Sequence, residues 1–184
     1  MTTRVTPCTW ASRCNDMPET MPAVVVMGVA GCGKSTVGAA LCLHTGARMI
    51  EGDAFHPESN IRKMSAGIPL DDADRAGWLA RLGEELAKAI ATGDTAVLAC
   101  SALKRRYRDT LRAAVPDVGF VYLALTPAEA AERVAHRPGH FMPATLIDSQ
   151  FRDLEPPTGE PRVLTVRATE PLASVVDSVV AWWR

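Results

Sequence analysis

The sequence has few of the features that mark secreted, membrane-bound or nucleic-acid-binding proteins. Its five cysteines form no CxxC pair and no histidine cluster has zinc spacing, so we expect reduced thiols in a cytoplasmic protein. No apolar run approaches the ~20 residues that span a bilayer, and none is of signal-peptide type. The net charge of −1 offers no electrostatic reason for a nucleic-acid or membrane partner.

What the chain does have is the composition of one globular domain. It has 184 residues, of which 47% are hydrophobic and 22% charged, which suits a single α/β domain with its own core. Residues 1–22 are rich in Thr, Pro and Cys and show neither a helical nor a strand period. We therefore expect a disordered N-terminal extension at 1–22, followed by a single domain at 23–184.

Apolar strands alternate with helical segments along this domain. The Val-rich run at 23–27 ends at glycines and predicts a strand buried on both faces. Further strands are predicted at 48–51, 95–100, 118–125 and 162–166. Helices are predicted at 34–44, 56–66, 104–115 and 126–136, and a longer helix begins at Asp71. After a break at 138–143, another helix is predicted to end at about Leu154. The last helix lies at the C-terminus, where the apolar stripe indicates core packing. This alternation predicts a three-layer α/β/α fold around a five-stranded parallel sheet, with ligands bound beyond the carboxyl ends of the strands.

A phosphate-binding loop follows the first predicted strand. Residues 28–35 match the G-x-x-x-x-G-K-[ST] pattern at every fixed position and lie between a strand and a helix. The glycines allow successive amides to turn inward around phosphate oxygens, and the helix directs its positive end at the same place. Lys34 is expected to reach the β- and γ-phosphates of ATP, and the Ser35 hydroxyl to bind Mg²⁺. The predicted ATP-binding residues here are Gly28, Val29, Ala30, Gly31, Cys32, Gly33, Lys34, Ser35 and Thr36.

Other features favour a small-molecule kinase among proteins with such a loop. The N-K-x-D segment of GTPases is missing, and the D-x-x-G at 74–77 lies in a polar helix start, so it is interpreted as coincidence. ATPase motors need a longer chain. Asp53 follows the second strand, where it can accept a proton from an acceptor hydroxyl. The alternative is that Asp53 only caps the next helix or orders waters around Mg²⁺.

Two arginines precede a Pro-Gly break late in the chain. Arg133 and Arg137 are four residues apart on one helix face, just before Pro138-Gly139. One of them is predicted to stack on adenine while the other reaches the phosphates. The alternative is that both are ordinary solvated surface arginines.

Longer blocks of sequence resemble those of the gluconokinases, relatives of shikimate and adenylate kinases. The resemblance covers most of residues 23–155 and includes Gly52-Asp53, His56-Pro57 and Asp74-Arg75. Its more specific blocks are Ser101-Ala102-Leu103-Lys104, Gly139-His140-Phe141 and Ser149-Gln150-Phe151. It implies an acceptor-binding insertion at about 53–80 and a mobile lid at about 137–152. It also implies Mg²⁺-dependent transfer of the γ-phosphate of ATP to the 6-hydroxyl of D-gluconate, giving 6-phospho-D-gluconate, by an enzyme that is a possible homodimer.

Gluconate is a polyol with one carboxylate, so its site needs hydroxyl-bonding groups and a cation. The candidates are Asp53, His56, Arg62, Arg75, Lys104, Arg108 and His140, and the expected catalytic residues are Lys34, Asp53 and Arg137. Arg75 and Lys104 are the first choices for the carboxylate, since both lie in blocks shared with the family, although Arg75 could instead pair with an upstream Asp in its helix. The sequence departs from its relatives at 163–169, where they often carry aspartates. A kinase for shikimate, a nucleoside monophosphate or another aldonate remains an alternative, as does a nucleotide-binding protein without catalysis.

Overall fold

The first strand shows how the chain builds its core. A computed structural model describes residues 21–135 and 144–184. In it β1 (Ala23–Met27) is buried at all five positions, as the sequence predicts. Its side chains alternate, so that Val24 and Val26 join one hydrophobic cluster and Ala23, Val25 and Met27 join another. The sheet therefore needs helices on both faces, because each face of β1 is apolar.

The five strands form one parallel sheet in the order β2-β3-β1-β4-β5. β1 lies at the centre, and the switch in strand order beside it brings the carboxyl ends of β1, β2 and β3 together. The strands after β1 are β2 (Arg48–Glu51), β3 (Ala96–Ala99), β4 (Gly119–Ala124) and β5 (Val163–Arg167).

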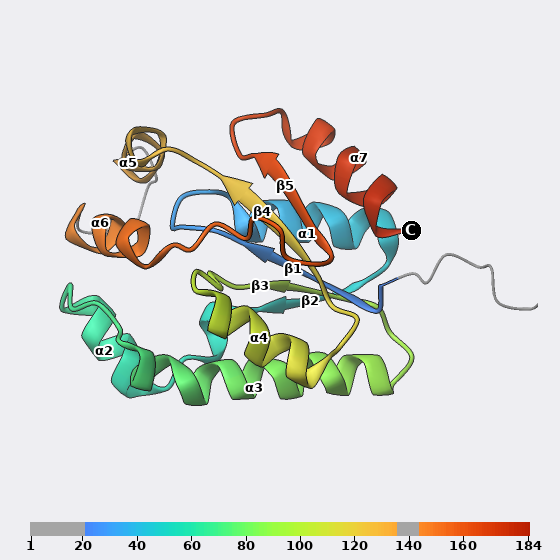
Figure 1. Cartoon of the computed structure of the whole chain (residues 1–184), viewed down its shortest axis with the longest axis horizontal. Coiled ribbons are helices and arrows are strands. Elements are labelled where there is room, and N and C mark those ends of the chain that lie inside the picture. Colours follow the sequence, from blue (N-terminus) through green and yellow to red (C-terminus); the bar gives the residue numbers. More distant parts are fainter. Residues whose placement is uncertain (1–20, 136–143) are drawn as a thin grey trace, which may run out of the picture.

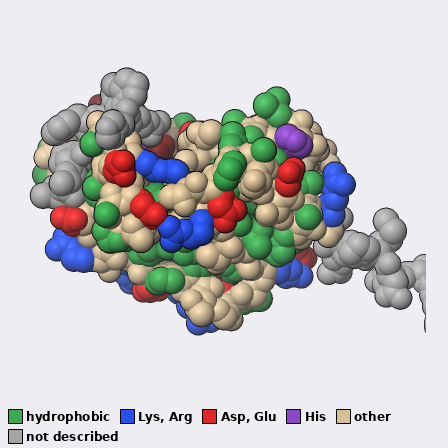
Figure 2. Space-filling model, turned by 90° about the horizontal axis from the view of Figure 1, so that it is seen from above, with side chains coloured by type: hydrophobic (Ala, Val, Ile, Leu, Met, Phe, Trp, Pro, Cys, Tyr) green, Lys and Arg blue, Asp and Glu red, His purple; other side chains and the backbone are tan. Residues whose placement is uncertain are grey.

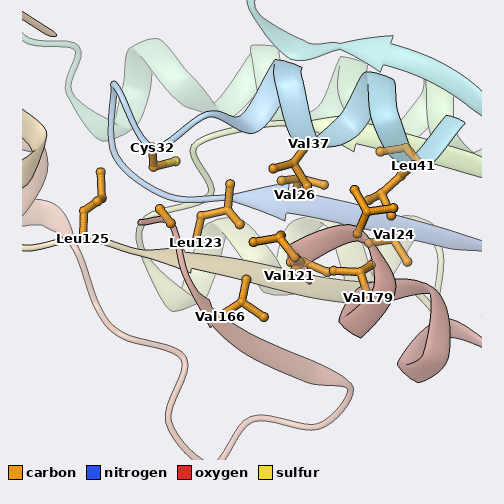
Figure 3. Packing of buried hydrophobic residues seen from close by; sticks show 14 of the residues in the cluster. Val24, Val26, Cys32, Val37, Leu41, Val121, Leu123, Leu125, Val166 and Val179 are labelled. Carbon is orange, nitrogen blue, oxygen red and sulfur yellow. The ribbon is translucent and has the colours of Figure 1, made fainter. Parts of the chain in front are cut away.

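Helices cover the sheet on both sides, which confirms the predicted three-layer architecture (Figure 1). α1 (Lys34–Thr45) and α7 (Leu172–Trp183) cover one face, and α3 (Asp72–Ala91) and α4 (Arg105–Ala114) cover the other. The apolar stripe of α7 is core, since Val175, Val176, Val179 and Trp183 are buried. Figure 3 shows Val179 packing toward β1 and β4 together with Val37 and Leu41 of α1.

Three further helices lie at the carboxyl edge of the sheet (Figure 1). They are α2 (Glu58–Ser65), α5 (Pro127–Ala135) and α6 (Ala144–Asp153). α2 begins two residues later than predicted, because a 3₁₀ turn, η1 (Gly52–Phe55), and His56-Pro57 precede it. The predicted break at 138–143 lies outside the described residues.

Met21, which precedes the predicted domain boundary, packs against the end of α7. Met21 is buried, and its carbonyl accepts a 2.7 Å hydrogen bond from the indole nitrogen of Trp183. Residues 1–20, which make up nearly all of the predicted extension, lie outside the described residues. Within the described residues, no helix is both long and apolar enough to cross a membrane. On the face seen in Figure 2, acidic and basic side chains are interspersed rather than segregated.

Candidate active site

A cavity of about 760 Å³ lies at the carboxyl edge of the sheet. Its wall combines the loop after β1 with the segment after β2, the first turn of α3, Ser101 in the segment after β3, and parts of α5 and α6. The lining residues are Ala30, Gly31, Gly33, Lys34, Ser35, Thr36, Glu51, Asp53, His56, Met64, Pro69, Leu70, Arg75, Ser101, Arg133, Leu146, Ser149 and Gln150. The volume is in the usual range for a small-molecule site.

The loop from Gly28 to Ser35 has the backbone that its glycines were expected to provide. Gly31 has φ +80°, and a Cβ atom there would lie 2.9 Å from Val134 of α5, so both conformation and space require glycine. The first helical hydrogen bond of α1 runs from Val37 N to Gly33 O. The amides of Lys34, Ser35 and Thr36 therefore precede the helical ladder and are available to an anion at the positive end of α1.

Two predicted members of this loop, Val29 and Cys32, have only their backbone available to a ligand. The side chains of Val29 and Cys32 are buried in the core beside α1, and Figure 3 shows Cys32 among the residues of this cluster. Gly28 N is already hydrogen-bonded to Ser101 O at 3.3 Å, which ties the loop to the segment after β3.

Lys34 is held at the loop. Its Nζ donates to the carbonyl oxygens of Gly28 at 3.2 Å and Val29 at 3.1 Å. An ammonium group has three donors, so one remains for a phosphate oxygen even while both carbonyls are bound. The arrangement suits a positive charge fixed beside the phosphates.

Asp53 is positioned by a buried framework beneath it. The indole nitrogen of Trp78 in α3 donates to Gly52 O at 2.8 Å, and a Cβ atom on Gly52 would approach Ala99 O to 2.5 Å. The turn η1 therefore lies directly against β3, and Asp53 within it lines the cavity. The sequence anticipated Asp53 but gave no indication that Trp78 would anchor it.

His56 forms a neutral polar wall next to Asp53. Its ring stacks on Trp78 with centroids 4.2 Å apart, and Asn60 Nδ2 lies 3.4 Å from His56 Nδ1. Burial lowers the pKa of His56, and the nearby Arg75 lowers it further against the opposing effect of Asp53. A neutral imidazole can both donate and accept hydrogen bonds, as a polyol requires.

Three of the predicted substrate-binding cations do not line the cavity. Arg62 is exposed and pairs with Glu58 at 3.2 Å on its own helix. The Lys104 side chain is 17% exposed and lies between Asp72 at 3.0 Å and Asp153 at 3.1 Å. Each of these two cations is thus bound to a carboxylate of the chain outside the cavity wall.

Arg108 has a structural position instead of the predicted substrate contact. Its side chain is 0% exposed and is paired with Glu160. It also donates to the carbonyl oxygens of Ala102 and Leu103, each at 2.9 Å, and to Glu155 O at 3.0 Å. Ala102 has φ +41°, an uncommon conformation for a residue with a side chain. Arg108 thus stabilises the turn that presents Ser101 to the cavity.

Of the four remaining predicted residues, two line the cavity and two lie outside the described residues. Arg75 lines it from the first turn of α3, without the predicted alternative of a pair with an upstream Asp. Arg133 lines it from α5 and donates to Ala168 O, after β5, at 2.7 Å. Arg137 and His140 lie outside the described residues.

Gln150 was missed as a site residue. Its Oε1 accepts a hydrogen bond from the amide of Ala30, in the phosphate loop, at 2.6 Å. It lies on α6 with Leu146 and Ser149 on the cavity side, while Ile147 packs into the core beside Phe151 and Leu154. The Ser149-Gln150-Phe151 block is part of the family resemblance. The spacing of the apolar positions in this helix indicates that Gln150 faces away from the core.

Cys100, which directly follows β3, is expected to be unreactive. Burial raises the pKa of its thiol to about 12, so it stays protonated. Within residues 21–135 and 144–184 no group of three or more His, Cys, Asp or Glu side chains is arranged to hold a metal. A cation that keeps several waters and binds phosphate oxygens, as Mg²⁺ does, needs no such group, and the Ser35 hydroxyl in the cavity wall fits that role.

Comparisons with known proteins agree with this geometry. Residues 24–157 match the family described as AAA domain. Gluconokinase of Gluconobacter oxydans is 44% identical over 157 residues, covering 85% of this chain and 88% of that protein. Thermosensitive gluconokinase of Escherichia coli is 39% identical, covering 83% and 82%.

A solved structure gives the same result in three dimensions. The crystal structure of a gluconokinase from Sinorhizobium meliloti matches with a TM-score of 0.82 and 48% identity, covering 89% of this chain and 92% of that one. The family match over residues 24–157 spans both the phosphate loop and the other segments that line the cavity. The chain therefore belongs to the gluconokinase family, within the AAA-domain family of phosphate-loop proteins.

Proposed function

We propose that this protein is an ATP-dependent kinase that phosphorylates D-gluconate on its 6-hydroxyl, giving 6-phospho-D-gluconate and ADP. The observation that carries the proposal is that Lys34 and Ser35 of the phosphate loop line the same cavity as Asp53 and His56. The family membership supports gluconate as the acceptor, because the relatives named above are gluconokinases.

The chain's own residues supply positioning and charge. The first amides of α1 and Lys34 hold the triphosphate, and the Ser35 hydroxyl would hold Mg²⁺, which neutralises phosphate charge when bound. The acceptor hydroxyl attacks the γ-phosphorus, the bond from that phosphorus to the β–γ bridging oxygen breaks, and the hydroxyl proton passes to Asp53. Arg133, next to the end of β5, would lie on the nucleotide side of the cavity.

The acceptor is tested by following ADP release with Mg·ATP and a panel of gluconate, shikimate, AMP and related sugar acids. We expect turnover with gluconate. Turnover with shikimate or AMP but not gluconate would assign the protein to another acceptor, and no turnover with any acceptor would favour a nucleotide-binding protein without catalysis.

The phosphate loop is tested with Lys34→Ala. Because the loop relies on a fixed cation beside the transferred phosphate, we expect gluconate turnover to fall at least ~10³-fold. Lys88→Ala is the matched control, since Lys88 is exposed on α3 and pairs only with Glu85. Full activity of the Lys34 variant would contradict the mechanism.

A further inference from the structure

Arg75 carries a buried positive charge without a matching carboxylate. The residue is 8% exposed, and its side chain lines the cavity. Its Nε is buried without a hydrogen-bond partner, and no ion pair joins Arg75 to another of the described residues. A buried guanidinium left in this condition is unfavourable unless another group completes its hydrogen bonds.

The acidic residues nearest in sequence do not neutralise Arg75. Asp71 and Asp74 form the capping box of α3, and Asp74 also binds Lys63 at 2.6 Å. Asp72 accepts hydrogen bonds from Tyr107, Lys104 and Arg106. All three carboxylates are therefore already bound to other groups, although each lies within four positions of Arg75.

The other cations of the candidate set are also bound elsewhere. Lys104 lies between two carboxylates, and Arg108 is paired with Glu160, both away from the cavity wall. Lys34 belongs to the phosphate loop, and Arg133 reaches the end of β5. Arg75 is thus the cation that lines the acceptor side, next to His56 and Ser101, among the residues described.

The Tyr107 ring supports the guanidinium from one side. The Arg75 Cζ atom lies 5.8 Å from the ring centroid, within the range in which a ring face favours a cation, and Lys104 and Arg106 lie at similar distances from the same ring. A fork held in this way is suited to a planar carboxylate, which it can bind through two parallel hydrogen bonds.

We propose that Arg75 binds the carboxylate of the acceptor and is the residue by which the site selects a sugar acid over a neutral polyol of the same length. The inference rests on the proposed function for the identity of the acceptor. In this arrangement the acceptor carboxylate lies at the first turn of α3, and the reactive hydroxyl lies beside Asp53. His56 lies between them and binds hydroxyl groups of the acceptor.

The test compares two acceptors that differ only at the charged end. Dissociation constants of D-gluconate and of D-glucitol, which has an alcohol in place of the carboxylate, are measured by calorimetry for wild type, Arg75→Gln and Arg75→Lys. We expect Arg75→Gln to weaken gluconate binding about 10- to 100-fold, the usual effect of losing a charge-assisted hydrogen bond. Glucitol binding and the KM for ATP should stay unchanged, and Arg75→Lys should retain part of the preference.

The controls separate a local structural role from recognition. Arg81→Gln removes an exposed arginine from the same helix, where it pairs with Glu85 at 3.2 Å, and should change neither dissociation constant. A structural role for Arg75 would weaken both acceptors and ATP together and lower the melting temperature. An unchanged gluconate-to-glucitol ratio in Arg75→Gln, or equal losses for both acceptors, would overturn the inference.

The wild-type arm distinguishes this failure from failure of the proposed function. If wild type binds and phosphorylates gluconate but Arg75→Gln keeps its preference, only the role of Arg75 is wrong. If wild type neither binds nor phosphorylates gluconate, the proposed acceptor is wrong and the inference is overturned with it.

Discussion

At the scale of single residues, the position of Asp53 depends on two residues that do not line the cavity, Gly52 and Trp78. Gly52 has no room for a side chain beside Ala99, and its carbonyl is bound by the indole of Trp78. These two contacts fix η1, and so Asp53 stands at a defined place rather than on a loose loop. A carboxylate held in this way can accept a proton from a hydroxyl presented next to the phosphate loop.

Replacing Asp53 with Asn tests this role. The substitution keeps the size of the side chain but removes its ability to take a proton, so we expect kcat for gluconate to fall about 10²- to 10⁴-fold. The KM for ATP should be unchanged, because the phosphate loop is untouched. Single-turnover kinetics would show whether the transfer step itself is slowed. An unchanged transfer rate would leave Asp53 only a structural role, and Glu58→Gln, an exposed substitution on α2, serves as control.

At the scale of elements, the sequence predicted the five strands and seven α-helices with small errors at their ends. Local signals were sufficient there, such as the capping box of Asp71 and Asp74 and that of Thr126 and Glu129. The turn η1 was missed because its four residues are fixed by Trp78, 26 positions away. For α6, the apolar spacing indicates which face joins the core, but the contact of Gln150 with the phosphate loop depends on the tertiary structure.

The contact between α6 and the phosphate loop leads to a prediction for Gln150→Glu. The Gln150 side chain is 2.6 Å from the Ala30 amide, so a carboxylate there would repel the phosphates of ATP with little change in shape. We expect the KM for ATP to rise about 10-fold or more, equivalent to at least ~1.4 kcal/mol, and the rise to shrink at high salt.

Two variants on the same helix serve as comparisons for Gln150→Glu. Gln150→Met removes the hydrogen bond without adding charge and should change the KM for ATP much less. Asp148→Asn alters the charge of α6 at an exposed position and should have no effect. Equal KM values for Gln150→Glu and wild type would show that nucleotide phosphates bind away from Ala30.

At the scale of the whole molecule, one buried charge network joins parts of the chain that the sequence alone does not connect. Arg108 on α4 and Glu160 before β5 are 52 positions apart, and Arg112 also binds Glu160 at 2.8 Å. Sequence reasoning assigned Arg108 to the substrate because a cation after a strand end is as compatible with a site as with a buried pair. The presence of Glu160 beside Arg108 distinguishes a buried ion pair from a substrate site. That contact depends on the conformation of the loop after α6.

This network predicts a specific loss of stability in Glu160→Gln. Removing the carboxylate leaves the fully buried Arg108 without its counter-ion, so we expect about 3–5 kcal/mol lower free energy of unfolding at neutral pH. Urea denaturation measures it. Asp109→Asn, which removes an exposed partner of Arg112, should cost no more than about 0.5 kcal/mol.

The pH dependence of that loss follows from the pKa of Glu160. Burial raises this pKa, but the hydrogen bonds from Arg108 and Arg112 outweigh burial and bring it below the ordinary value of 4.5. A carboxylate whose pKa is lowered on folding stabilises the fold at pH values above 4.5. This contribution disappears as the pH falls through the folded-state pKa. The difference in unfolding free energy between wild type and Glu160→Gln should therefore be constant above pH 4.5 and decrease below pH 4.5. A difference that stays the same through the acid range would mean that the Glu160 carboxylate is not what stabilises Arg108.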